Sequence, residues 1–140
     1  MKSVRVCTNF IRFVEKEFDD YSARFDQQLV GTLKYRGPAV LAEMLHEYGA
    51  NEFASAVDLG CGTGLMGKEL GEKTGYLLGV DLSSKMLAKA GERGVYDELE
   101  RGDIVQVLAS SDRTFDLVVS ADVLIYVGDL LPVMRAVAEK

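Results

Sequence analysis

The stretch Val57-Asp58-Leu59-Gly60-Cys61-Gly62-Thr63-Gly64 decides the fold. A short apolar run contains a carboxylate near its end, and glycines follow at alternate positions. Because glycine has no Cβ, the backbone can turn sharply there and approach a ligand closely. From Leu65 onward the residues have helical character, and the first amide groups of such a helix point at whatever the loop holds. The stretch therefore predicts a strand, a ligand-binding loop and a helix in succession.

The residues after this loop alternate between apolar runs and amphipathic stretches. We predict strands at 54–59, 75–81, 95–99 and 115–120, and helices at 65–73, 83–93, 104–109 and 130–138. Strands and helices that alternate at this spacing form right-handed βαβ units around a parallel sheet. The predicted fold class is therefore α/β, a Rossmann-like doubly wound parallel sheet of about four strands.

The beginning of the chain has a different character, because its apolar residues recur at helical spacing. One stripe comprises Phe10, Val14, Phe18, Tyr21, Phe25 and Leu29. It predicts a helix capped by Asn9 and ended by Gly31, with a weak point near Asp19-Asp20. We therefore divide the chain into an N-terminal helical cap, residues 1–50, and a cofactor-binding Rossmann-like domain, residues 51–140.

A second N-terminal helix is expected from Pro38 to Tyr48, before Gly49, because proline is favoured in the first helical turn. Its predicted inward face comprises Leu41, Met44, Leu45 and Tyr48.

A second carboxylate, Asp81, ends the second predicted strand, 17 residues after Gly64. A carboxylate at this place can accept hydrogen bonds from both hydroxyl groups of a ribose. A tight turn without a ligand would explain the glycines but not this acid. The residues thus predict a site for a nucleoside-bearing cofactor.

Two classes of cofactor are compatible with the glycines. Residues 62–67 satisfy the literal G-x-G-x-x-G pattern of dinucleotide-binding proteins, so an NAD(P)-dependent oxidoreductase is one alternative. The strand ends at Leu59, however, and a fingerprint that begins at Gly60 meets a leucine, Leu65, where its third glycine belongs. Asp58 would also repel a pyrophosphate. S-adenosylmethionine has an ammonium group and no phosphate, and it suits this site better.

As a set, these motifs resemble those of the class I S-adenosylmethionine-dependent methyltransferases. VDLGCGTG at 57–64 is similar to the first motif of that family, and GVDLSSKML at 79–87 is similar to the second. The resemblance continues through residues 102–104 and 115–122. The stretch at 18–38 further resembles predicted bacterial methyltransferases that often follow tetratricopeptide repeats, although the chain has no such repeats.

The resemblance implies that S-adenosyl-L-methionine is the cofactor and assigns a part of it to each motif. Asp58 and the loop backbone would hold the methionine portion, Asp81 the ribose, and the residues after Asp81 and at 103–104 the adenine. The implied cofactor-binding residues are Asp58, Gly60, Cys61, Gly62, Thr63, Gly64, Asp81, Leu82, Met86, Asp103, Ile104, Ser120 and Ala121. Two of them have simpler alternatives, since Met86 is equally compatible with the core and Asp103 with a helix cap.

The implied reaction is an SN2 methyl transfer, which needs alignment and exclusion of water more than acid or base chemistry. Asp122, Tyr126, Tyr21 and Tyr35 with Arg36 are candidates near the methyl group, and none is favoured as a catalytic residue. The acceptor is a small molecule or an unidentified protein. A module that binds the cofactor without turnover is the other alternative.

The remaining expectations follow from charge, cysteines and length. A net charge of −6 argues against nucleic acid or an anionic membrane as the main partner. Cys7 and Cys61 match neither a disulfide framework nor a zinc site. Without a signal peptide or a long apolar run, a cytoplasmic location is expected. The resemblance implies a seven-stranded sheet, so we expect a C-terminally short domain whose strand at 115–120 is an exposed edge. That edge predicts either homo-oligomers or a truncated domain with weak activity.

Overall fold

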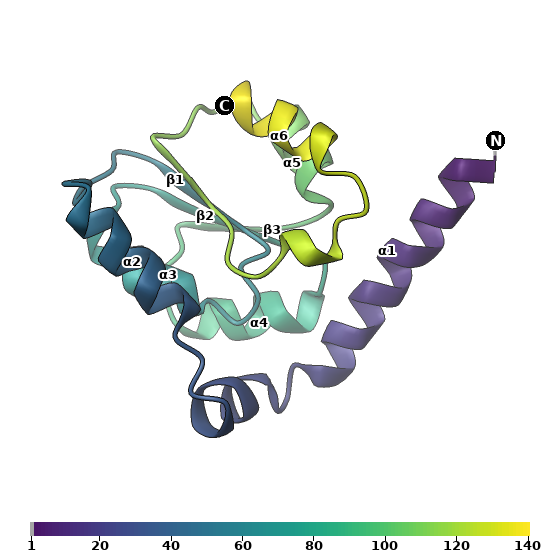
Figure 1. Ribbon diagram of the computed structural model, residues 1–140, viewed down its shortest axis with the longest axis horizontal. Coiled ribbons are helices and arrows are strands. Elements are labelled where there is room, and N and C mark those ends of the chain that lie inside the picture. The colour runs from purple at the N-terminus through teal and green to yellow at the C-terminus, as the bar shows by residue number, and fades with distance from the viewer. Residues whose placement is uncertain (1) are drawn as a thin grey trace.

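A parallel sheet forms the centre of the molecule (Figure 1), which we describe from a computed structural model. The backbone is described for residues 2–140, and the side chains from residue 12 onward except at residue 32. The strands are β1 (Ala56–Leu59), β2 (Leu77–Asp81), β3 (Glu98–Arg101) and β4 (Leu117–Val119). All pairs are parallel, in the order β3-β2-β1-β4. This order confirms the predicted fold class.

Helices cover both faces of the sheet (Figure 1). The chain alternates α3 (Leu65–Leu70), α4 (Ser84–Glu92), α5 (Ile104–Ser110) and α6 (Leu130–Ala138) with the strands, and short 3-10 turns, η2 (Gly71–Lys73) and η3 (Leu124–Tyr126), extend two of the connections. Successive residues of a strand point to opposite faces. In β1, Val57 and Leu59 therefore pack with residues of α5 and α6, whereas Ala56 packs with α3 on the other face.

Most predicted elements are confirmed, and β3 is the clearest exception. The sequence predicts a strand at 95–99, whereas β3 begins at Glu98. Val95 and Tyr96 do not belong to a strand. The Tyr96 side chain packs against Gly67 of α3, and the Val95 side chain packs against Gly71 of η2. Asp97 then joins the connection to β2, because its carboxylate accepts a hydrogen bond from the Leu77 amide at 2.7 Å.

The N-terminal helical region consists of α1 (Lys2–Tyr21) and a π-helical segment, η1 (Gln27–Thr32). The prediction that Asn9 caps the helix is wrong, since α1 already begins at Lys2. The helix ends at Tyr21, the residue after Asp20, so the predicted weak point near Asp19-Asp20 is confirmed. Beyond this end the Phe25 ring lies 5.4 Å from the Tyr21 ring. The side chains of Cys7 and Phe10 lie outside the described residues.

The second N-terminal helix, α2 (Gly37–Glu47), has Pro38 in its first turn, as predicted. Leu41 and Leu45 pack against the sheet. Met44 and Tyr48, also predicted to face inward, are 46% and 84% exposed, so that part of the prediction is wrong. The reason is that β4, the strand beside them, is the edge of the sheet.

Candidate functional site

The glycine loop lies where β1 ends and folds across the end of β2. Gly60, Gly62 and Gly64 have φ angles of 72°, 54° and 84°, a region that disfavours other residues. The amides of Gly60 and Cys61 both donate to the carbonyl oxygen of Val80, at 2.7 and 2.9 Å. The loop is therefore tied to the strand that carries the second acid.

Asp81 bridges this loop and the next helix. One of its carboxylate oxygens accepts a hydrogen bond from the Gly62 amide at 2.9 Å, and the other accepts one from the Ser83 amide at 2.8 Å. Burial raises the pKa of Asp81, and these amide donors oppose that shift. An ionised carboxylate accepts about four hydrogen bonds, so each oxygen keeps room for one more. The structure thus brings together the two features that the sequence singles out.

Asp58 lies in β1, just before the glycine loop, and is only 1% exposed. Its Oδ2 accepts a hydrogen bond from the hydroxyl of Tyr96 at 2.7 Å. Burial raises the pKa of Asp58 to about 7; the hydrogen bond from Tyr96 opposes this shift, and the charge of Asp81 adds to it. The sequence did not indicate Tyr96 as a site residue, because Tyr96 lies in a segment predicted to be a strand.

The N-terminal helical region reaches the glycine loop through Asp26. Its carboxylate accepts a hydrogen bond from the Thr63 hydroxyl at 2.5 Å and forms an ion pair with Arg93 at 2.6 Å. Arg93 also donates from Nε to the Thr63 carbonyl oxygen at 2.5 Å. A residue of the N-terminal helical region therefore helps to fix the loop.

Two further carboxylates connect α1 to the neighbouring loops. Asp19 accepts hydrogen bonds from the Ser83 hydroxyl at 2.5 Å and from the Lys85 amide at 3.3 Å. The hydrogen bond from Ser83 is the main reason that the pKa of Asp19 is lowered. Glu15 forms an ion pair with Arg101 at the end of β3. No pattern in the sequence predicts these contacts, since spacing alone assigns both acids to a solvated helix face.

The loop that follows β4 contains a residue with a left-handed backbone conformation. Asp122 has a φ of 57°, which is uncommon outside glycine and often marks a functional site. Burial, and then the neighbouring Asp122 carboxylate, raise the pKa of Tyr35. The Tyr126 ring lies 5.2 Å from the Phe18 ring in an edge-on arrangement. These candidates for the methyl end therefore lie where the N-terminal region meets the segment after β4.

Comparison with known proteins identifies the family. The family described as "Methyltransferase domain" matches residues 57–139 of this chain. The chain belongs to this family. The resemblance to class I S-adenosylmethionine-dependent methyltransferases is thus confirmed at the level of the family and its fold.

Two relatives that are similar to this chain differ in the substrates that their names give. An 18S rRNA (guanine-N(7))-methyltransferase of Bos taurus is 38% identical over 64 residues, which are 46% of this chain and 23% of that protein. A trans-aconitate 2-methyltransferase of Deinococcus radiodurans is 39% identical over 66 residues, 45% of this chain and 26% of that protein. The matched part of the chain is thus only about a quarter as long as either relative.

Similarity to a solved structure extends over more of the chain. An S-adenosylmethionine-dependent methyltransferase from Clostridium acetobutylicum superposes with a TM-score of 0.68 at 26% sequence identity. The superposition covers 87% of this chain and 52% of that one. It therefore includes most of the elements described above and about half of the solved protein.

The remaining motif residues of the methyltransferase domain have structural roles in this conformation. Asp103 caps α5, because its carboxylate accepts hydrogen bonds from the amides of Val105 and Gln106 at 3.0 and 3.2 Å. Met86 is fully buried, and Ile104 is 9% exposed. The simpler alternatives for Asp103 and Met86 therefore describe what these side chains do here.

Three other residues of the predicted set lie at strand ends. The Leu82 carbonyl oxygen accepts a hydrogen bond from Arg101 at 3.2 Å. The Ser120 hydroxyl donates to the Leu59 carbonyl oxygen at 3.1 Å and so joins the ends of β4 and β1. Ala121 is half-buried and directly follows Ser120.

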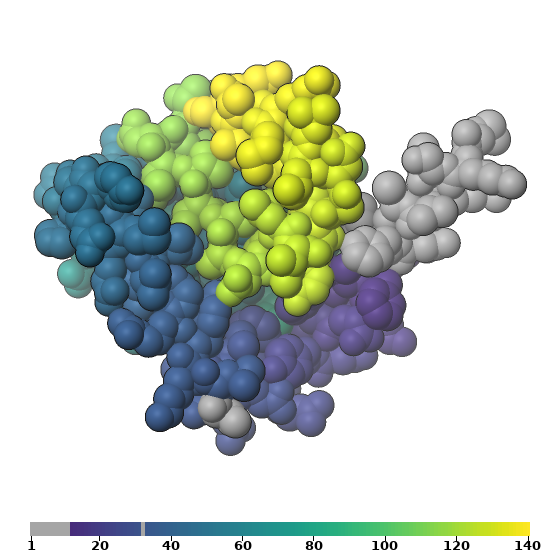
Figure 2. All heavy atoms as spheres, viewed as in Figure 1, coloured from purple at the N-terminus to yellow at the C-terminus, as the bar shows by residue number. Residues whose placement is uncertain are grey.

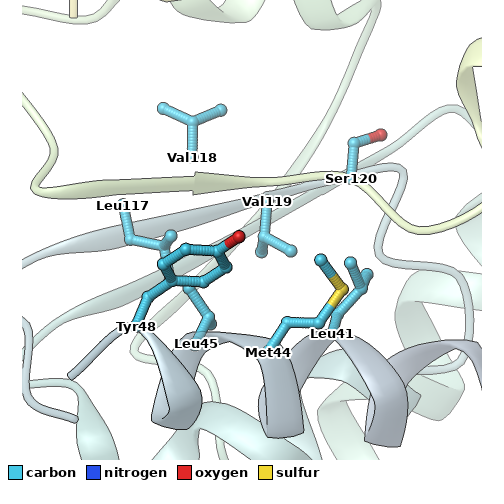
Figure 3. Close-up of a pocket in the computed structure, with 8 residues that line it drawn as sticks. All are labelled: Leu41, Met44, Leu45, Tyr48, Leu117, Val118, Val119 and Ser120. Atoms are coloured by element: carbon cyan, nitrogen blue, oxygen red, sulfur yellow. The ribbon is translucent and has the colours of Figure 1, made fainter. Parts of the chain in front are cut away.

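A cavity of about 320 Å³ lies away from the glycine loop, between α2 and the open edge of β4. We call it the β4 groove, and it is lined by Leu41, Met44, Leu45, Tyr48, Leu117, Val118, Val119 and Ser120. Figure 3 shows Leu117 and Val119 pointing toward α2, whereas Val118 points away from it. The lining is mostly apolar, with Ser120 and Tyr48 as its polar residues, and contains no carboxylate, so the groove does not suit a cationic cofactor.

The described residues offer no metal site, since no three acidic, histidine or cysteine side chains among them converge on one point. Nor is any helix in the described part of the chain long and apolar enough to cross a membrane.

Proposed function

We propose that this methyltransferase domain binds S-adenosylmethionine and transfers its methyl group to an acceptor. The observation that carries the proposal is the pair of acids on the two sides of the glycine loop, the buried Asp58 and the half-buried Asp81. S-adenosylmethionine has two positive groups, the sulfonium and the ammonium, and no phosphate. Opposite charges attract strongly where water is excluded, whereas a pyrophosphate would be repelled. The charge of the site therefore favours this cofactor over NAD(P).

The proposed contacts follow the geometry of the loop. Asp58 and the backbone around the loop glycines would hold the methionine portion, with Ser120 and Ala121 near its amino group. Asp81 would bind the ribose, because both of its oxygens keep room for a hydroxyl donor. Leu82, Asp103 and Ile104 would surround the adenine. Met86 would support that pocket from behind, since its side chain is buried.

In the proposed reaction, a lone pair of the acceptor attacks the methyl carbon as the bond to sulfur breaks. The electron pair of that bond returns to sulfur, and S-adenosylhomocysteine leaves. The cofactor supplies the activated methyl group, so the protein has to align the two reactants and exclude water. A base is needed only when the acceptor must lose a proton, and we assign none.

We propose that residues 1–50 act as a cap over the carboxyl ends of the strands, where the glycine loop and Asp81 lie. We call this end of the sheet the cofactor edge. The support is the set of three carboxylates, Glu15, Asp19 and Asp26, each of which contacts a different part of that edge. In Figure 2 the purple and blue atoms of this region border the green and yellow atoms of the C-terminal half along one side. A cap of this kind helps to exclude water from the sulfonium.

We propose a small molecule or a protein as the acceptor. By their names, one of the two relatives above acts on an RNA base and the other on a small organic acid, so the second relative supports the small-molecule class and neither supports a protein acceptor. The net charge of −6 favours an acceptor without a nucleic-acid backbone. A cytoplasmic location stays a prediction from the sequence.

The first test is calorimetric binding of S-adenosylhomocysteine, NAD and NADP to the purified chain. We expect only the first to bind. Family membership already counts against the oxidoreductase alternative. A chain that binds S-adenosylmethionine and methylates no offered acceptor would instead support the alternative of a binding module without turnover.

Asp81→Ala should weaken binding of S-adenosylhomocysteine by roughly 5–150-fold, as expected for the loss of charge-assisted hydrogen bonds worth about 1–3 kcal/mol. Titration calorimetry measures the change. Asp112→Ala is the matched control, because Asp112 is an exposed carboxylate that is not among the predicted cofactor-binding residues. Unchanged affinity in Asp81→Ala would show that the ribose is bound elsewhere.

We propose that two copies associate through the open edge of β4. Among the described strands, β4 pairs only with β1, so one row of its backbone groups is free to pair with a second copy. Sedimentation velocity should show a concentration-dependent dimer. Met44→Lys, at the rim of the β4 groove, should shift it to monomer, whereas Ile125→Lys, at an exposed apolar residue outside the groove, should not. A wild-type monomer at every concentration would rule out this dimer.

A further inference from the structure

The ring of Tyr96 lies in a space that exists because three surrounding residues are glycines. A Cβ on Gly67 of α3 would lie 2.3 Å from the Cζ atom of the ring. On Gly79 of β2 it would lie 2.9 Å from Cδ1, and on Gly64 of the loop 3.0 Å from Cε2. Contacts from a helix, a strand and a loop leave the ring a single orientation, which locks its rotamer.

The hydrogen bonds of the Tyr96 hydroxyl fix where its proton points. The Gly67 amide donates to this oxygen at 3.2 Å. A backbone amide is only a donor, so the hydroxyl accepts there and gives its single proton to Oδ2 of Asp58, 2.7 Å away. The phenol therefore acts as a fixed donor to that one carboxylate oxygen.

The Tyr96 hydroxyl also determines which oxygen of Asp58 stays free. A charge that is almost fully buried needs hydrogen-bond partners to stay in place. In the described part of the chain, a donor contacts Oδ2 of Asp58 and none contacts Oδ1. Oδ1 is thus available to a ligand, and the hydrogen bond from Tyr96 to Oδ2 sets the direction in which Oδ1 points.

We propose that Tyr96 is a positioning residue, which holds Oδ2 of Asp58 so that Oδ1 faces the ammonium group of the cofactor. The inference rests on the proposed function, and it assigns to Tyr96 an effect on one end of the cofactor only. The amino-acid end depends on Asp58, whereas the adenosine end depends on Asp81 and the residues after it. Removing the Tyr96 hydroxyl therefore affects ligands that carry the amino acid and spares those that lack it.

The experiment compares S-adenosylhomocysteine with 5′-methylthioadenosine, which has the same nucleoside but no amino or carboxyl group. Titration calorimetry is carried out with the full chain and with Tyr96→Phe between pH 6 and pH 8. We expect Tyr96→Phe to bind S-adenosylhomocysteine about tenfold more weakly and methylthioadenosine equally well. As the pH is lowered, the affinity for S-adenosylhomocysteine should also decline at a higher pH than in the wild type, because a hydrogen bond that favours ionised Asp58 is lost.

The matched control is Tyr76→Phe. The Tyr76 hydroxyl also donates to a carboxylate, that of Glu98 at 2.6 Å, but at an exposed position outside the site. This variant should leave both affinities and the pH profile unchanged. A second check adds Tyr96→Phe to Asp58→Asn, where it should have no further effect on S-adenosylhomocysteine, because the two residues act as one unit.

Several outcomes would overturn the inference. Equal weakening of both ligands, or an unmoved pH profile, would mean that Tyr96 only supports the fold. Normal S-adenosylhomocysteine binding by Tyr96→Phe would refute the role of Tyr96 and leave the proposed function intact. If the wild-type chain bound neither ligand, the proposed function would fail, and this inference with it. Phenylalanine fills the same three-glycine space, so the variant is expected to fold.

Discussion

Gly67→Ala should destabilise the protein by about 2–4 kcal/mol, although alanine normally stabilises a helix relative to glycine. Gly67 lies inside α3, and its new Cβ would be 2.3 Å from the Cζ atom of Tyr96 and 2.4 Å from the hydroxyl oxygen. Atoms cannot approach so closely, so the ring must move away from Asp58. A buried carboxylate then loses its donor, which adds to the cost of the displaced ring. Urea unfolding followed by circular dichroism measures the change.

Gly91→Ala is the control for helix propensity. Gly91 lies in α4, and a Cβ there would be 3.5 Å from a methyl carbon of Leu99, an ordinary contact. This substitution should stabilise the protein by about 0.4–1 kcal/mol. If Gly67→Ala stabilised the protein by a similar amount, the Tyr96 ring would not be packed against α3 as described.

The fold could be predicted from the sequence because most signals are local. Pro38 and Ser83 mark helix starts that the structure confirms, and the apolar run before the glycine loop becomes a buried strand. The start of β3 could not be predicted in the same way. Val95 and Tyr96 have the apolar character of a strand, yet their side chains pack against α3 and η2, and the strand begins only after them.

The candidate site is only partly predictable, for a related reason. Gly60, Gly62, Gly64 and Asp81 form a pattern within one βαβ unit, so their spacing indicates that they meet. The contacts of Asp26 with Thr63 and of Tyr96 with Asp58 join residues that are 37 and 38 positions apart. No periodicity or motif connects such residues. One indirect signal is present, since a glycine inside a helix, Gly67, indicates that something large packs against it.

The second large effect concerns the pH dependence of stability, and Asp58→Asn isolates it. In the folded protein the pKa of Asp58 is raised from 3.8 to about 7, mainly by burial. Between pH 3.8 and pH 7, Asp58 is ionised in the unfolded chain but still protonated in the folded protein. Raising the pH through this range therefore favours the unfolded state. Asp58 therefore lowers the free energy of unfolding by up to about 1.4 kcal/mol per pH unit as the pH rises toward 7. Above pH 7 the group is ionised in both states, and the penalty stays constant.

The amide that replaces the acid in Asp58→Asn does not titrate, so this pH dependence disappears in the variant. The amide still offers an oxygen that accepts the hydrogen bond from Tyr96, so the packing is retained. We expect Asp58→Asn and the wild type to have similar stability near pH 4, and the variant to become more stable by about 2–4 kcal/mol by pH 7. Urea unfolding at half-unit pH intervals measures the difference.

The same substitution should have the opposite effect on the ligand. An ammonium group needs the ionised form of Asp58, so wild-type affinity for S-adenosylhomocysteine should rise as the pH passes through about 7. Asp58→Asn should bind more weakly at pH 8 and lose this rise, while its stability is higher. Proteins commonly retain such destabilising groups where function requires them. A stability difference that does not vary with pH would mean that Asp58 is not held as a buried acid, and the proposed ion pair with the ammonium would then lose its basis.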